Sequence, residues 1–119
     1  MKTGKTNPII GETIEALRQV SYEKGAPIWK DVARRLAKGT RRVPGVNVGR
    51  IGKYTAAKDQ VLVPGKVLGS GDLQHAVVVA GMGFSARARD KITKAGGECI
   101  DLLELTRRNP KGTNVKIMV

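Results

Sequence analysis

The stretch of sequence that most constrains the fold is VVVAGMGFSARARDKITKAGG, which occupies residues 77–97. Its first four residues are apolar and mostly β-branched, as expected of a buried strand. Ser85 stands where a side-chain cap begins a helix, which we expect over residues 86–95 before a glycine pair ends it. Gly81 and Gly83 lie between these two elements and permit a tight turn from strand to helix. The stretch therefore indicates a mixed α/β fold.

Nucleotide binding is one function that this stretch suggests. Gly81-x-Gly83-x-x-Ala86 matches the start of a dinucleotide-binding loop, and the stretch from Glu98 to Asp101 follows with acidic residues at about the right distance to contact a ribose. However, too few residues follow Gly83 to complete the two βαβαβ halves of such a fold. The expected helix is densely basic, and the sequence offers no obvious base or nucleophile. A small nucleotide-binding domain is therefore kept as the alternative function.

Positive charge is the strongest functional signal in the chain. Lys and Arg number 22 and Asp and Glu number 10, which gives a formal net charge of +12 over 119 residues. Such an excess repels itself unless a polyanion neutralises it, so nucleic acid is the expected partner. Residues 32–58 contain no acidic residue, and a basic block of this kind neutralises phosphates and releases counterions. No apolar run approaches the ~18 residues of a membrane span, and we expect no membrane partner.

The residue types narrow the kind of nucleic acid. Aromatic residues make up 3% of the chain, too few for a surface that stacks on bases. Recognition of the backbone and shape of a folded RNA fits better, and a free DNA-binding protein is a further alternative.

The sequence does not indicate a disulfide, a metal site or a catalytic site. The single Cys99 and the single His75 form neither an internal disulfide nor a plausible zinc site, which agrees with a reducing cytoplasm. The N-terminus lacks the apolar core of a signal peptide. We expect no enzyme activity, no catalytic residue, no metal, no cofactor and no small-molecule substrate.

The apolar periodicity predicts a single domain over residues 1–119, of class α/β (α+β). Residues 7–39 indicate an antiparallel pair of helices, and residues 40–45 a basic linker. Residues 46–119 indicate a mixed α/β part with an irregular β-β-α arrangement.

Short elements are expected within this mixed part. Residues 46–54 carry an alternating apolar pattern that suggests a strand. Residues 61–63 predict a second strand, which Pro64-Gly65 closes. Near the C-terminus we expect a strand over 98–102, a short helix over 103–108 and a final strand over 115–119.

Two stretches, KVLGSGDL and VVVAGMGFSARARDKITKAGG, make the chain similar to a known family. It resembles the archaeal and eukaryotic large-subunit ribosomal protein eighteen-e, a relative of the widespread large-subunit protein fifteen. A more specific mark is VNVGRIGKY, residues 46–54, which follows Arg41-Arg42 and resembles the family signature around Asn47, Arg50 and Ile51. The residues that match the shared C-terminal pattern are Lys66, Gly69, Gly71, Val77, Val79, Phe84, Ser85, Ala88, Ile92 and Gly96.

This resemblance covers essentially the whole chain and implies a function. The family implies a structural role in the large ribosomal subunit, bound to 23S-type rRNA beside neighbouring large-subunit proteins, without catalysis. It also implies a cytoplasmic location within the ribosome, and N-terminal helices followed by an irregular β-β-α arrangement. Only a few residues precede Asn7, where the bacterial relative has a long Gly/Arg-rich extension, and the chain also lacks the extra length of eukaryotic members. Together these two differences indicate the archaeal form.

The acid-free block supplies the first candidates for phosphate contact. These are Arg41, Arg42, Arg50 and Lys53. For Asn47 two interpretations stay open, namely contact with RNA and a role in forming and orienting the turn.

Further candidates follow along the chain. Lys66 is expected in a flexible glycine turn, where its ammonium reaches a phosphate. Arg87 and Arg89 fall in the first turns of the expected helix, where cations oppose the helix dipole, so an external anion is their expected partner. Arg107, Arg108 and Lys111 form a second basic patch near the C-terminus. For this patch two interpretations stay open, namely contact with RNA and simple exposure of the charges to solvent. The whole predicted RNA-binding set is Lys38, Arg41, Arg42, Asn47, Arg50, Lys53, Lys66, Arg87, Arg89, Arg107, Arg108 and Lys111.

Overall fold

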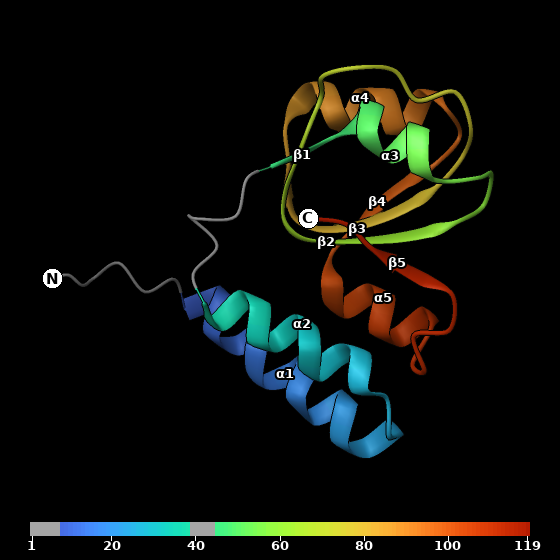
Figure 1. The fold of residues 1–119 in the computed structure, drawn as a ribbon. Helices are drawn as coiled ribbons and strands as arrows, with labels where there is room; N and C mark the ends of the chain where they lie inside the picture. Colours follow the sequence, from blue (N-terminus) through green and yellow to red (C-terminus); the bar gives the residue numbers. More distant parts are fainter. Residues whose placement is uncertain (1–7, 39–44) are drawn as a thin grey trace, which may run out of the picture.

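The computed structural model describes residues 8–38 and 45–119. The helices and strands in these ranges build an α/β fold, as the sequence predicts (Figure 1). No helix in them is long and apolar enough to cross a membrane. In chain order the elements are α1 (Pro8–Lys24), α2 (Pro27–Ala37), β1 (Val46–Asn47), α3 (Val48–Tyr54), β2 (Gln60–Leu68), β3 (Val78–Phe84), α4 (Ala86–Lys94), β4 (Glu98–Ile100), α5 (Leu102–Arg108) and β5 (Val115–Ile117).

The two N-terminal helices form the helical pair that the sequence predicts, and they lie side by side in Figure 1. Gly25 has a φ of +62°, a left-handed conformation that glycine adopts without steric cost, and the chain reverses there. The Ser21 hydroxyl donates to the Ala26 carbonyl oxygen at 2.9 Å and closes the turn. Pro27 then opens α2, because its missing N–H is one that a first helical turn leaves unbonded in any case.

The strand pairs of the sheet are all parallel, and β2 lies among them with a partner on each side. β3 pairs with β2, and β4 adds to β3. On the other side of β2, β5 pairs with residues 60–62 and β1 pairs with residues 67–68. The carboxyl ends of β1, β2 and β3 therefore meet at one end of the sheet. The start of α4 lies there too, because the Ser85 N–H donates to the Val67 carbonyl oxygen at 2.9 Å.

Both faces of the sheet are covered, which accounts for the nearly continuous apolar runs in β2 and β3. Val61 and Val63 belong to the hydrophobic cluster that includes residues of α3 and α4. Leu62 and Ala80 belong to a second cluster, which α1, α2 and α5 complete. Alternate residues of one strand thus face opposite layers. Figure 1 shows α3 and α4 on one side of the sheet, and α5 with the helical pair on the other.

The expected strand over residues 46–54 is wrong in most of its length. Only Val46 and Asn47 are in a strand, and α3 follows at once. Val48 and Ile51 are both fully buried. Their spacing of three residues places them on one face of a helix, so the apolar positions that resemble alternation fit a helix better.

The predicted end of β2 is also wrong. The strand does not stop at Pro64-Gly65 but continues to Leu68. Its register against β3 shifts between Val63 and Lys66. The proline is tolerated because it lies in this irregular segment, where one ladder hydrogen bond is dispensable.

Candidate nucleic-acid interface

The fold separates the predicted RNA-binding residues into groups. Arg41 and Arg42, with most of the expected linker, fall in residues 39–44 and so lie outside the described residues. Lys38 is the C-cap residue of α2, directly before that segment. Its side chain is exposed and has no ion pair or hydrogen bond with any residue that the structure describes.

α3 carries Arg50 and Lys53, both exposed. Arg50 Nη1 donates to the main-chain oxygen of Val119, and the Lys53 ammonium lies 5.6 Å from the centroid of the Tyr54 ring. Within the described ranges, neither cation pairs with a carboxylate side chain. Neither side chain is therefore held by an Asp or Glu of the described residues, which favours a contact with an external anion such as phosphate.

α4 carries Arg87 and Arg89, and both side chains are exposed. Arg87 makes no ion pair or hydrogen bond through its side chain with the part of the chain described. Arg89 Cζ lies 5.2 Å from the centroid of the Phe84 ring, a cation–π distance that leaves its donors free for an anion. As the sequence predicts, Ser85 caps the helix by accepting from the Ala88 N–H at 3.1 Å.

Lys66 and Asn47 both lie close to the carboxyl end of the sheet. The position of Lys66 differs from the one that the sequence predicts. Lys66 is not in a glycine turn but within β2, where it is exposed while Gly65 and Val67 are buried. The irregular register of β2 carries the strand past the residues that suggested the turn. Asn47 Oδ1 accepts from the Ser70 N–H at 3.1 Å, so its side chain orients the neighbouring loop.

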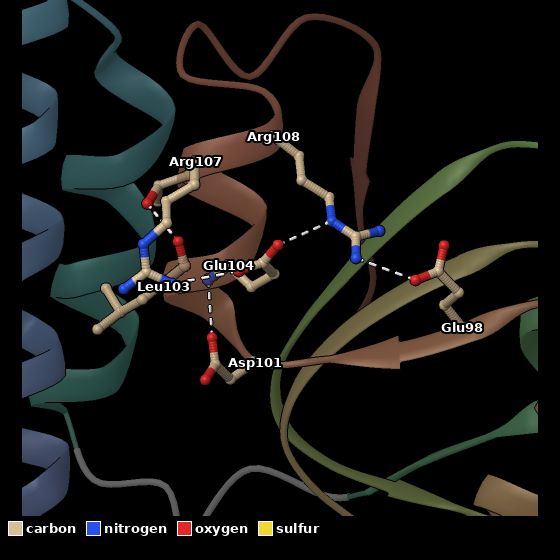
Figure 2. A network of polar contacts seen from close by, with 7 residues as sticks. Glu98, Asp101, Leu103, Glu104, Arg107 and Arg108 are labelled. Carbon is tan, nitrogen blue, oxygen red and sulfur yellow. Dashed lines mark hydrogen bonds and ion pairs between the residues drawn. The ribbon is translucent and has the colours of Figure 1, made fainter.

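The two arginines at the end of α5 are held by carboxylates, as Figure 2 shows. Arg108 Nε lies 3.0 Å from Glu104, and Arg108 Nη2 lies 3.0 Å from Glu98. Arg107 Nη1 lies 3.2 Å from Glu104. The hydrogen bonds from Arg108 lower the pKa of both glutamates, and the hydrogen bonds to Glu98 and Glu104 raise the pKa of Arg108.

Lys111 is also engaged within the protein. Its ammonium donates to the carbonyl oxygen of Lys24, the last residue of α1, at 3.3 Å. A cation at this helix end is favourable because it faces the negative end of the helix dipole. The C-terminal group of predicted cations therefore makes internal contacts that compete with any phosphate.

Sequence reasoning missed one cation with an unusual environment. Lys91 lies on α4, and its ammonium donates to the carbonyl oxygens of Gly69 at 2.7 Å and Gly71 at 2.6 Å. The spacing of four residues from Arg87 places the two on one side of the helix. Nothing in the local pattern shows that Lys91 meets a loop about 20 residues earlier in the chain.

The glycines of the supposed nucleotide loop do not form a loop. Gly81 and Gly83 lie inside β3 and pair with β2, so the expected glycine turn is wrong. Only Ser85 separates β3 from α4. A main chain that is paired in a sheet cannot also wrap a pyrophosphate. Of the two candidates for a ribose contact, Asp101 instead caps α5 by accepting from the Glu104 N–H at 2.7 Å, and Glu98 pairs with Arg108 at 3.0 Å. No group of three or more His, Cys, Asp or Glu side chains in the described ranges could hold a metal ion.

Four of the predicted cations, two on α3 and two on α4, lie in the same layer of the molecule. α3 and α4 contact each other and cover the same face of the sheet (Figure 1). Within the described residues, none of the four pairs with an Asp or Glu side chain. Other cations do, namely Arg18, Arg34, Arg35, Lys94, Arg107, Arg108 and Lys116. We call the set the α3–α4 cationic surface: Arg50, Lys53, Arg87 and Arg89.

Known proteins are similar to this chain over nearly its full length. The model of the family described as "Ribosomal protein 60S L18 and 50S L18e" matches residues 13–119. A large ribosomal subunit protein eL18 from Methanothermobacter thermautotrophicus is 50% identical over 117 residues, covering 98% of this chain and 97% of the relative. Proteins of the same name from Methanococcus maripaludis and Archaeoglobus fulgidus are 46% identical over 117 residues and 47% identical over 115 residues. These two matches cover 98% and 97% of this chain and 98% of each relative.

Proposed function

Because the chain belongs to the family of ribosomal proteins 60S L18 and 50S L18e, we propose that it is a structural constituent of the large ribosomal subunit. In this role it binds and stabilises folded 23S-type rRNA through contacts of Arg and Lys with phosphates. The family is one of ribosomal proteins and not of enzymes. The protein works within the ribosome, in the cytoplasm, beside other large-subunit proteins.

One observation carries the RNA-binding part of this proposal. The four cations of the α3–α4 cationic surface lie on one side of the sheet, and none of them pairs with an Asp or Glu side chain of the described residues. Cations that are already paired have less to gain from a phosphate than cations that are solvated. Arg41 and Arg42, which precede β1 in the sequence, extend the same basic block. We therefore place the main RNA contact on α3, α4 and the segment that leads into β1.

The test is a charge-removal variant of this surface, with Arg50→Ala, Lys53→Ala and Arg87→Ala together. Binding to transcribed 23S rRNA of Methanothermobacter thermautotrophicus is measured over a range of salt concentrations, as is incorporation into large subunits. Each lost phosphate contact lowers the salt dependence of log K by about one. We expect the slope to fall by about two to three, with weaker incorporation. The paired change Arg41→Ala and Arg42→Ala is expected to lower it further.

The matched control removes three cations that are paired with carboxylates, through Arg18→Ala, Arg34→Ala and Lys94→Ala. This control has the same net charge as the test variant, and we expect its salt slope to change by less than about one. Equal effects of the two variants would show that net charge, and not this surface, determines binding.

The two alternative functions make different predictions. A free DNA-binding protein would lose 23S rRNA to an excess of duplex DNA, whereas we expect the rRNA complex to survive this competition. A nucleotide-binding domain would gain thermal stability from NAD, FAD or ATP. The pairing of Gly81 and Gly83 within the sheet argues against that gain.

A further inference from the structure

The loop at residues 69–71 lies between the first turns of α3 and α4. On the α3 side, the Gly49 N–H donates to the Ser70 carbonyl oxygen at 2.9 Å, and the Ser70 N–H donates to Asn47 Oδ1 at 3.1 Å. These two hydrogen bonds join the loop to both sides of the junction between β1 and α3. The loop is therefore attached to α3 through its middle residue.

The same loop packs against both helices too closely for side chains. A Cβ at Gly71 would lie 2.6 Å from the Cα of Gly49, and Gly71 itself has a φ of +87°. On the other side, a Cβ at Gly69 would lie 2.5 Å from the Cβ of Arg87. Glycine is required here because the main chain of the loop touches the main chain of α3 and the first turn of α4. A change in the loop would therefore be transmitted to both helices.

Lys91 closes this arrangement from the α4 side. Its ammonium donates to two carbonyl oxygens of the loop, those of Gly69 at 2.7 Å and Gly71 at 2.6 Å. An ammonium has three donors and no acceptor, so two of the three are directed to one loop. A charged donor makes stronger hydrogen bonds than a neutral one, and the side chain is partly removed from solvent. These contacts leave Lys91 poorly placed to bind phosphate itself.

We propose that Lys91 is a positioning residue that joins α3 and α4, through the loop 69–71, into one rigid RNA-binding surface. The inference rests on the proposed function and assigns Lys91 a role different from that of its cationic neighbours. Arg50 and Lys53 on α3 and Arg87 on α4 can match a folded RNA only if the two helices keep a constant relative position. Lys91 lowers the ordering cost of binding, because the surface is formed before the RNA arrives.

The test variant is Lys91→Met, which keeps an apolar chain of similar length and removes the ammonium. We expect amide hydrogen exchange at Ser70 and Gly49 to accelerate about tenfold. Without the Lys91 ammonium the loop is held less firmly, so the hydrogen bonds of these two amides open more often. We expect affinity for transcribed 23S rRNA to weaken about fivefold. The slope of log K against log salt is expected to stay unchanged, because no phosphate contact is removed.

The matched control is Lys94→Met, which removes the same charge from the same helix. Lys94 is exposed and pairs with Asp90 at 3.2 Å, away from the loop contacts of Lys91. We expect this variant to leave exchange at Ser70 and Gly49 unchanged and to alter RNA affinity by less than twofold. Circular dichroism checks that each variant is folded. If Lys91→Met does not fold, Lys91→Gln is measured in the same way. We expect a smaller effect from Lys91→Gln because the glutamine amide is still a hydrogen-bond donor, although an uncharged one.

Two outcomes would overturn the proposal. A salt slope that falls by about one with normal exchange would show that Lys91 binds a phosphate directly. Faster exchange with unchanged RNA affinity would show that the loop is not needed for RNA recognition. Failure of the proposed function gives a separate signature, since the unmodified protein would then show no preference for 23S rRNA over duplex DNA.

Discussion

Trp29 shows how one residue connects distant parts of this chain. It is the only tryptophan and is fully buried between the helical pair and the sheet. Its indole N–H donates to the Pro110 carbonyl oxygen at 2.7 Å, across 81 positions of sequence. No local pattern in the sequence shows this hydrogen bond, because its two partners lie far apart along the chain. The indole thus fastens α2 to the turn between α5 and β5.

Replacing Trp29 with Phe tests this connection. The variant keeps an aromatic ring but leaves the Pro110 carbonyl oxygen without its donor. We expect the free energy of unfolding to fall by about 1–2 kcal/mol, measured by denaturant titration. Tyr22→Phe is the control, because Tyr22 is 86% exposed and its change should have almost no effect. Equal stability of Trp29→Phe and the unmodified protein would contradict the importance of the hydrogen bond.

At the scale of elements, the ion-pair network of Figure 2 joins the start of β4 to the end of α5. Arg108 lies between Glu98 and Glu104, and its hydrogen bonds lower the pKa of both carboxyl groups. A carboxyl group with a lowered pKa in the folded protein favours folding at pH values above its unfolded pKa. This contribution disappears as the pH falls through the folded pKa, because both states are then protonated.

The network therefore predicts a stability difference that depends on pH. We expect Arg108→Gln to have a lower melting temperature than the unmodified protein at about pH 7, and the difference to shrink as the pH falls through the lowered pKa values of Glu98 and Glu104. Thermal unfolding followed by circular dichroism measures it. Lys30→Gln removes an equal charge from an exposed side chain that has no ion pair within the described residues. The difference in melting temperature between Lys30→Gln and the unmodified protein should not shrink in this way at low pH. A difference for Arg108→Gln that persists at low pH would rule out the carboxylates as its cause.

At the scale of the whole molecule, the sheet separates two hydrophobic clusters that share its strands. Val63 belongs to the cluster that includes α3 and α4, and its neighbour Leu62 belongs to the cluster that the helical pair completes. Loss of the helical pair would expose Leu62 and Ala80 to water, so neither layer is independent of the other. We propose on this ground that residues 1–119 unfold as a single domain.

Cooperative unfolding is the corresponding prediction. Trp29 fluorescence reports on the helical pair, and far-ultraviolet circular dichroism reports on the helices and strands together. We expect both signals to give the same midpoint in a denaturant titration, as two-state unfolding requires. Loss of the tryptophan signal at a lower denaturant concentration would show instead that the helical pair is a separate unit.

The parts of the fold that follow local patterns could be predicted from the sequence. The helical pair, the Ser85 cap and α5 near its expected bounds are confirmed, because caps, helix-stopping glycines and apolar spacing act over a few residues. The same local reasoning fails at β2 and α3. The course of β2 past Pro64 depends on its pairing with β3, and a few apolar residues in α3 fit either a strand or a helix.

The sequence by itself determined the family, the α/β class and the expectation of an RNA partner, because these rest on residue order, composition and charge. Only the tertiary structure decided which cations of the described residues pair with an Asp or Glu side chain. Arg108 meets Glu98, and Lys91 meets the loop 69–71, through contacts between residues 10 to 22 positions apart. Such contacts depend on how helices and strands pack, and a local pattern carries no information about them. The tertiary structure thus separates cations that pair with groups of the protein from cations that, within the described residues, do not.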